Sequence, residues 1–268
     1  MEKLITTIKS ITSTRSTLPF AVYSSIKEQK LLNVPIAKPL LIVVLSGDKE
    51  LGDIEKFTCH SGDFIFLSDN PALSMRNIPK NEEYFALLIE FDHHIFDGLT
   101  LTAPSKQNYC IGKTTQMLER CLIQFVDSCL WAPEKITTMR KKEIIEMLCY
   151  LGHKQILSMV GNAKIDHRIH DMFCQQNYEE LTIEYICQTL AMSESTLRRK
   201  LKAEGTSVQE IKDQARLGQG LNLLQTTNYP IGLIAQKCGY QSQSRFTERF
   251  KGRFGLTPSE LRKTKMVG

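Results

Sequence analysis

The chain has 268 residues, of which 42% are hydrophobic and 24% are charged, and its formal net charge is +5. This length is typical of two domains, and the hydrophobic content supports a core in each. Residues 1–20 lack the apolar core of a signal peptide, and the apolar run at residues 40–45 is too short to cross a membrane, so we expect neither secretion nor membrane insertion. Residues 166–268 hold 15 basic and 11 acidic side chains, so +4 of the charge lies in the C-terminal part, where it suits phosphate binding.

The eight cysteines are expected to be reduced, in a cytoplasmic protein. The sequence contains no C-x-x-C pair. Cys187 and Cys238 occupy core positions of the repeated unit described below, where a thiol acts as a small hydrophobic group.

Residues 39–91 are predicted to form strands and turns. Apolar runs at residues 40–45, 64–67 and 84–91 are separated by glycine, aspartate and asparagine turns. Short strands with such turns favour a small β-barrel or a sandwich.

Two possible ligand sites in this half are rejected. His60 and the adjacent pair His93 and His94 are poor metal ligands as a set, because neighbouring residues on a strand point to opposite faces. Residues 112–114 read Gly-Lys-Thr, but a phosphate-binding loop needs a glycine where this chain has Gln107. We expect Gly112 to end a loop before a helix, and we expect no cofactor and no metal.

Helical apolar spacing follows at residues 114–131 and again from Ile144 to Met159, with a break at residues 132–134. The two helices are predicted to form a hairpin that either covers the barrel or forms a dimer face, and the sequence leaves both open. Residues 160–164 are the predicted linker, and residues 166–176 a helix that leads into the C-terminal part.

Residues 181–262 contain the same unit twice, each time a short helix, a tight turn and a second helix. Cys187 corresponds to Ala235, and Leu197 to Phe246, with a turn one residue longer in the second copy. This unit is a helix-turn-helix, whose second helix enters the major groove of DNA. Two amphipathic helices with solvated polar faces are the alternative, but two copies in register favour the motif.

The polar face of each second helix lies opposite its buried face, at about 100° per residue. Leu197 and Leu201 mark the buried face in the first copy, and Phe246 and Phe250 in the second. The residues predicted to contact DNA are Ser195, Thr196, Arg198, Arg199, Lys202, Gln243, Ser244, Arg245, Thr247, Glu248 and Lys251.

A helix start follows each copy, because Ser207 and Thr257 each precede a glutamate by three residues, the spacing of a capping box. The helix from Ser207 to about Thr226 joins the two units and is about 30 Å long. That length is close to the distance of about 34 Å between successive major grooves on one face of DNA. Gly220 lies inside this helix and is predicted to allow close packing.

The second copy carries a set of specific residues, namely Ile234-Ala235, Gly239-Tyr240, Ser242-Gln243-Ser244, Phe246, Phe250-Lys251, Phe254-Gly255 and Thr257-Pro258. With these, residues 181–262 resemble the DNA-binding domain of the AraC/XylS transcription regulators. Arg216 also falls where the linker helix of that family has arginine. Gly220 replaces its usual alanine, and Ile211 stands where tyrosine is frequent.

The resemblance implies an α+β protein. A cupin-like β-barrel with a helical hairpin (residues 1–160) would serve ligand sensing, dimerisation or both, and an all-α domain with two helix-turn-helix motifs (residues 166–268) would bind DNA. It further implies a bacterial, cytoplasmic transcription activator or repressor with double-stranded DNA and RNA polymerase as partners. A small-molecule effector in the barrel and a homodimer stay open. An enzyme is the alternative, but we find no nucleophile–base motif, metal cluster or cofactor loop; an architectural protein without sequence preference is disfavoured by Glu248, whose carboxylate repels phosphate.

Overall fold

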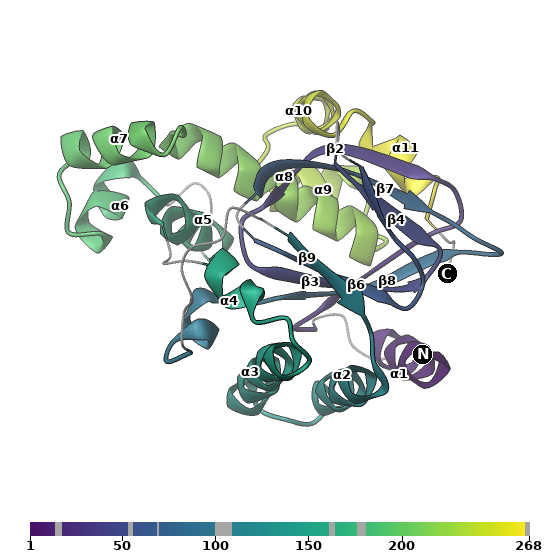
Figure 1. Cartoon of the computed structure of the whole chain (residues 1–268). Coiled ribbons are helices and arrows are strands. Elements are labelled where there is room, and N and C mark those ends of the chain that lie inside the picture. Colours follow the sequence, from purple (N-terminus) through teal and green to yellow (C-terminus); the bar gives the residue numbers. More distant parts are fainter. Residues whose placement is uncertain are drawn as a thin grey trace.

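The structure is a computed structural model that describes residues 1–13, 18–52, 56–68, 70–99, 109–160, 164–175 and 181–265. Its N-terminal half contains two antiparallel sheets packed face to face (Figure 1). The five-stranded sheet has the order β1-β8-β3-β6-β9, and the four-stranded sheet the order β2-β7-β4-β5. The strands are β1 (Ala21–Ser25), β2 (Gln29–Ile36), β3 (Leu40–Ser46), β4 (Asp48–Leu51), β5 (Phe57–Cys59), β6 (Asp63–Leu67), β7 (Asn70–Ile78), β8 (Tyr84–Glu90) and β9 (Tyr109–Lys113).

The five-stranded sheet is buried on both faces, which explains why its central strands are continuously apolar. In β3, Leu41 and Val43 belong to the core under the helices, whereas Ile42 and Val44 belong to the core between the sheets. Strands β6 and β8 alternate in the same way. The predicted α+β fold is therefore confirmed, but the two sheets form a cupin-like sandwich and do not close into a barrel.

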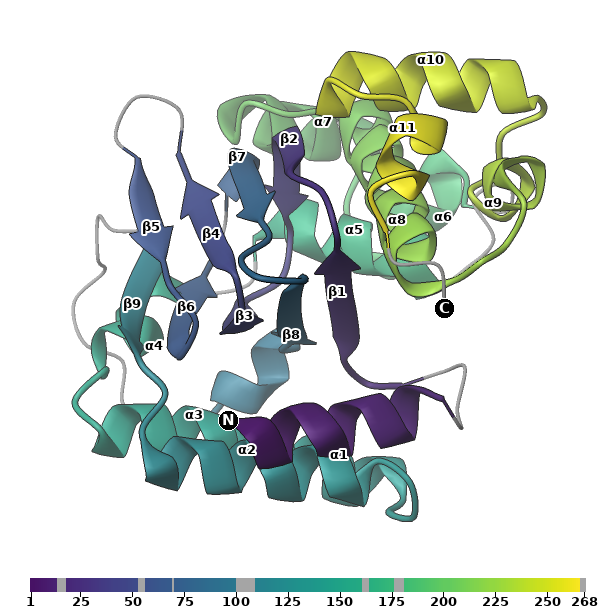
Figure 2. The same ribbon diagram turned by 90° about the vertical axis from the view of Figure 1, so that its right-hand side faces the viewer.

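Helices α1 (Glu2–Thr12), α2 (Gln116–Ser128) and α3 (Glu134–Tyr150) cover the outer face of the five-stranded sheet (Figure 2). The predicted second helix of the hairpin is wrong in its length. It ends at Tyr150, and a short helix α4 (Gln155–Val160) follows, because Gly152 adopts a left-handed backbone with φ of 97°. The predicted linker after it lies mostly outside the described residues, which omit 161–163.

Two further expectations for this half are corrected. His93 and His94 lie on a 3-10 helix, η1 (His93–Phe96), and not on a strand, so the argument from strand geometry does not apply to them. Gly112 lies inside strand β9 and not in a loop. A Cβ atom there would come within 2.6 Å of both Phe64 and His153, so glycine is needed for close packing.

Seven helices form the described C-terminal half: α5 (Ile165–Gln175), α6 (Ile183–Thr189), α7 (Glu194–Ala203), α8 (Val208–Thr226), α9 (Ile231–Lys237), α10 (Gln243–Phe254) and α11 (Pro258–Arg262). The first motif has a core of its own, built from α5, α6, α7 and the start of α8. The second motif instead shares the core that lies between the two sheets. No helix in the described part of the chain is long and apolar enough to cross a membrane.

The two halves meet along β1, β2, α8 and α10 (Figure 2). Strand β2 is irregular between Leu31 and Ile36, and this irregular stretch reaches the end of α10. Leu32 fills the space where Gly255 would carry a Cβ atom, at 2.9 Å. Asn33 Nδ2 donates to the carbonyl oxygen of Arg253 at 3.3 Å. A further contact between the halves is the ion pair of Lys38 Nζ with Asp171 Oδ1 of α5, at 3.1 Å.

Candidate nucleic-acid interface

The turns of the two motifs have the same hydrogen bonds at corresponding positions. Met192 N donates to Cys187 O, and Tyr240 N to Ala235 O, both at 2.9 Å. The residue before each of these donors has a left-handed backbone, with φ of 50° at Ala191 and 73° at Gly239. The repeat predicted from sequence is therefore present in the backbone geometry, although only the second copy has the glycine that this conformation favours.

Each second helix begins with a serine cap. The Ser193 side chain accepts from Thr196 N at the start of α7, and the Ser242 side chain accepts from Arg245 N at the start of α10. Helix N-termini of this kind carry partial positive charge, which suits a DNA phosphate. Both helices lie toward the same side of α8, whereas α6 and α9 lie on the other (Figures 1 and 2).

Nine of the predicted DNA-contacting side chains are exposed, and Thr196 and Thr247 are half-buried. Arg198 is held by Glu194 one turn earlier, through hydrogen bonds of 2.7 and 2.6 Å. The Thr196 hydroxyl accepts from the Ser193 cap at 2.9 Å. Thr196 thus supports the cap. Arg198 would have to break its contacts with Glu194 before it could bind DNA.

Helix α8 holds the second motif through Arg216. Its guanidinium donates to Cys238 O at 2.6 Å and to Gly239 O in the turn, and it lies 4.1 Å from the centre of the Tyr240 ring. Near the same place, a Cβ atom on Gly220 would come within 2.7 Å of the Phe246 ring. The predicted role of Gly220 in close packing is confirmed. The capping box is complete at Thr257, but at Ser207 only the serine side of it is present.

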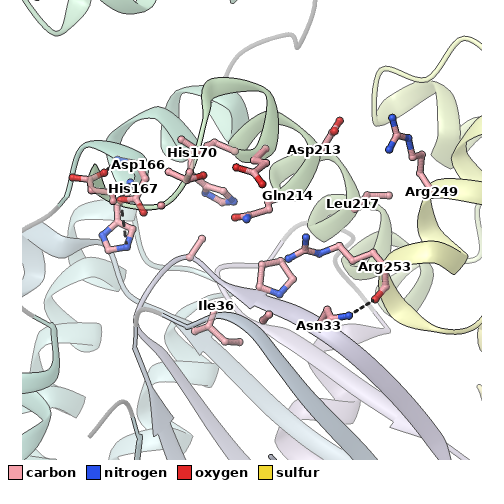
Figure 3. A pocket seen from close by; sticks show the side chains of 18 of the residues that line it. Asn33, Ile36, Asp166, His167, His170, Asp213, Gln214, Leu217, Arg249 and Arg253 are labelled. Atoms are coloured by element: carbon pink, nitrogen blue, oxygen red, sulfur yellow. Dashed lines mark hydrogen bonds and ion pairs between the residues drawn. The ribbon is translucent and has the colours of Figure 1, made fainter. Parts of the chain in front are cut away.

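A cleft of about 1100 Å³ separates the two motifs, with β2 at its base and α8 along one side (Figure 3). Glu248, Arg249 and Arg253 of α10 line it, so Glu248 faces this cleft as well as solvent. Five acidic side chains lie along it: Asp166, Glu204, Glu210, Asp213 and Glu248. Burial lowers the pKa of the Arg253 guanidinium, and the negative charges of Asp213 and Glu210 oppose this shift.

A second hollow, with a volume of about 460 Å³, lies where the N-terminal sandwich meets α5 and α8. Apolar side chains of both sheets line it together with residues of these two helices. Lys49 also lines it, although its exposed fraction is only 1%. Sequence reasoning missed this residue, because a lysine in the stretch Asp48–Leu51 has the pattern of a solvated strand. Among the described residues, no group of three or more metal-ligating side chains could hold a metal ion.

Comparison with known proteins places this geometry in a family. Residues 186–264 match the model of a helix-turn-helix domain. The chain is 33% identical over 101 residues to the urease operon transcriptional activator of Escherichia coli, covering 38% of this chain and 33% of that protein. It is 33% identical over 146 residues to the transcriptional regulator AdiY of Escherichia coli K12, covering 54% and 49%. The C-terminal part is an AraC-type helix-turn-helix domain.

The match to the HTH-type transcriptional regulator GadX of Escherichia coli O6:H1 is similar, with 36% identity over 127 residues and 46% of each chain covered. The chain thus spans at most about half the length of these curated relatives, which are described as regulators or activators of transcription. The fold of the whole chain is that of ToxT from Vibrio cholerae. A ligand-free point variant of ToxT has a TM-score of 0.68 at 16% identity, covering 94% of this chain and 100% of that one.

Proposed function

We propose that this protein is a sequence-specific transcription regulator of a bacterium, whose two motifs read adjacent major grooves of one DNA site. The observation that carries the proposal is the pair of serine-capped helices, α7 and α10, held on one side of a single rod. Helix α8 has 19 residues, which gives a length of about 28 Å, and adjacent grooves are about 34 Å apart. We place the protein in the cytoplasm, with RNA polymerase as a second partner, and keep residues 166–268 as the DNA-binding domain.

The exposed side chains suggest a division of roles. Arg199 is our candidate for a bidentate contact with guanine, because it projects from α7 opposite the buried Leu197. Lys251 is our candidate for a phosphate contact. Glu248 repels phosphate and would be useful only at a chosen base, where a carboxylate can accept from cytosine N4.

Competition binding of the full chain to specific and random DNA at several salt concentrations tests these roles. Arg199→Ala should weaken binding to the preferred site by about 1–3 kcal/mol and relax the choice at one position. Lys251→Ala should weaken all sequences about equally and lower the salt slope by about one. Glu248→Ala should strengthen random binding. If Arg199→Ala and Glu248→Ala both leave the ratio of specific to random affinity unchanged, the assigned reading faces are wrong.

We further propose that residues 1–160 sense an effector and support dimerisation. The cavity at the junction of the sandwich with α5 and α8 is lined mostly by apolar side chains. One ToxT structure of the same fold, with a TM-score of 0.65, is described as bound to an unsaturated fatty acid. A small, mostly apolar molecule is therefore the proposed effector class.

The proposed dimer face is the outer surface of α2 and α3, which expose Met117 and Met139. Sedimentation of the full chain tests whether this face pairs two copies.

A further inference from the structure

Helix α7 has an ion pair at the end that would enter the major groove. Glu194 is its first residue, directly after the Ser193 cap, and Arg198 follows one turn later. Arg198 Nε donates to Glu194 Oε1 at 2.7 Å, and Arg198 Nη2 lies 2.6 Å from the same oxygen. The side chain of Arg198 is 65% exposed and that of Glu194 is 50% exposed. A recognition helix contacts base edges mainly with its N-terminal residues, so this pair lies where DNA would bind.

The carboxylate of Glu194 has two effects on the helix, and both are small. It interacts favourably with the positive end of the helix dipole, and a glutamate four residues before an arginine is the favourable order for an ion pair on a helix. Exposed ion pairs of this kind add little to stability. At the end of a DNA-reading helix the same carboxylate also repels phosphate. Its main consequence is therefore expected in DNA binding.

The second motif lacks this pair. Gln243 occupies the position of Glu194, and Thr247 that of Arg198. Helix α10 begins with a serine cap of the same kind, and its first turn has no acidic residue. The Gln243 side chain lies against α9 instead, because a Cβ atom on Gly232 would be 3.1 Å from Gln243 Oε1. The motif can thus start its second helix without a carboxylate at this position, and the formation of the helix does not explain Glu194.

The pair also singles out one of four basic side chains. Helix α7 contains Arg198, Arg199, Lys200 and Lys202. Of these, only Arg198 has an ion pair within the part of the chain that the structure describes. Arg199 is exposed and projects opposite the buried Leu197. The two neighbouring arginines thus differ, because one is neutralised within the helix and the other is available to DNA.

We propose that Glu194 is a specificity-determining residue of the first motif, because it keeps Arg198 from binding DNA phosphates. As a pair, the two side chains have no net charge, so Arg198 releases no counterion from DNA and adds nothing to the affinity for random sequences. Arg199 is then left to select the site through guanine. This inference rests on the proposed function and adds a residue that lies outside the predicted DNA contacts.

The test compares the full chain with its Glu194→Gln variant on two DNA duplexes, one of random sequence and one that the wild type selects from a random pool. Glu194→Gln should bind the random duplex at least about threefold more tightly, and its salt slope should steepen by about one, because the released Arg198 neutralises one more phosphate. Affinity for the selected duplex should rise less. Unfolding would weaken binding, so it cannot produce this gain. An unchanged random affinity and salt slope in folded Glu194→Gln overturn the proposal.

A double variant tests whether Arg198 supplies the gain. Glu194→Gln with Arg198→Ala removes both charges of the pair, so its random affinity should return to within about twofold of the wild type, with the wild-type salt slope. A gain that persists in the double variant would come from the lost repulsion of the carboxylate alone. That result would overturn the restraint of Arg198 by Glu194.

Glu184 provides a matched control, because it is also an exposed glutamate in the first turn of a helix of the first motif. It belongs to α6, which lies on the other side of α8 from α7 (Figures 1 and 2). Glu184→Gln makes the same change of net charge and should leave random affinity within about twofold of the wild type. An equal gain in both variants would be an effect of net charge and would overturn the assignment. If the wild type binds neither duplex, the proposed function itself fails, whereas a wild type that binds DNA and a Glu194→Gln variant that behaves like it refute only the role of Glu194.

Discussion

Gly220 and Gly218 offer a matched pair of substitutions in one helix. Both lie inside α8, so replacing either by alanine gains about 0.5–1 kcal/mol from helix propensity. At Gly218 the new Cβ would lie 3.9 Å from Pro35, an ordinary contact. At Gly220 it would lie 2.7 Å from the Phe246 ring, which is fully buried, so the ring or helix α10 must shift. Overpacking of this kind costs about 1–3 kcal/mol.

We therefore expect Gly218→Ala to stabilise the protein and Gly220→Ala to be less stable than Gly218→Ala by about 1–3 kcal/mol. Urea denaturation of the two variants measures the difference. Adding Phe246→Leu to Gly220→Ala should recover part of the loss, which a double-mutant cycle reports as coupling. Equal stability of the two alanine variants would refute the packing argument and leave the wild-type glycine at position 220 without a structural reason.

Three further predictions follow from the buried and turn residues. Burial lowers the pKa of Lys49 in the folded protein to about 7, from its ordinary 10.5, so between these pH values the unfolded state binds one proton more than the folded state. The free energy of unfolding of the wild type relative to Lys49→Met should therefore rise by up to about 1.4 kcal/mol per pH unit from pH 7 to 9. Urea denaturation at several pH values measures this, and the same pH dependence of stability in both proteins would contradict it. Arg216→Leu should lower the free energy of unfolding by about 1–3 kcal/mol and weaken DNA binding, because the turn carbonyls lose a charged donor and Tyr240 loses its stacking partner. Urea denaturation and DNA titration measure the two effects. Arg216→Lys should recover only part of the lost stability and affinity. Ala191→Gly should raise stability by up to about 1 kcal/mol in calorimetry, because Ala191 has the left-handed backbone that Gly239 has in the other motif; a loss of stability would show that this turn is not strained.

The C-terminal half was largely predictable from sequence because its signals are local. The spacing of Leu197 and Leu201 and of Phe246 and Phe250 indicated the buried faces, and all four are buried in the structure. Caps, turns and helix α8 follow from residues close in the chain. The DNA-contacting side chains themselves stay a prediction, as do the domain bounds.

The N-terminal half was harder to predict because its structure depends on distant partners. Helix α1 was missed, although Leu4, Ile8 and Ile11 have helical spacing, because the residues between them include threonine and serine, which are weak helix formers. Strands β1 and β2 carry polar residues at inward positions. Gln29 reads as solvent-facing until Asn77 and Gln225 are placed beside it, and no local pattern reveals those contacts.

The separate core of the first motif means that the two helix-turn-helix motifs are attached to the rest of the protein in different ways. The second motif shares its apolar cluster with the sandwich, so it cannot loosen without opening that cluster. The first motif, with Leu197 and Leu201 in a cluster of its own, can open or tilt as a smaller cooperative unit. The second motif is thus held by the core of the sandwich, whereas the first is held by its own core on α8 and by the ion pair of Lys38 with Asp171. Under partial denaturation the first motif should therefore open before the second.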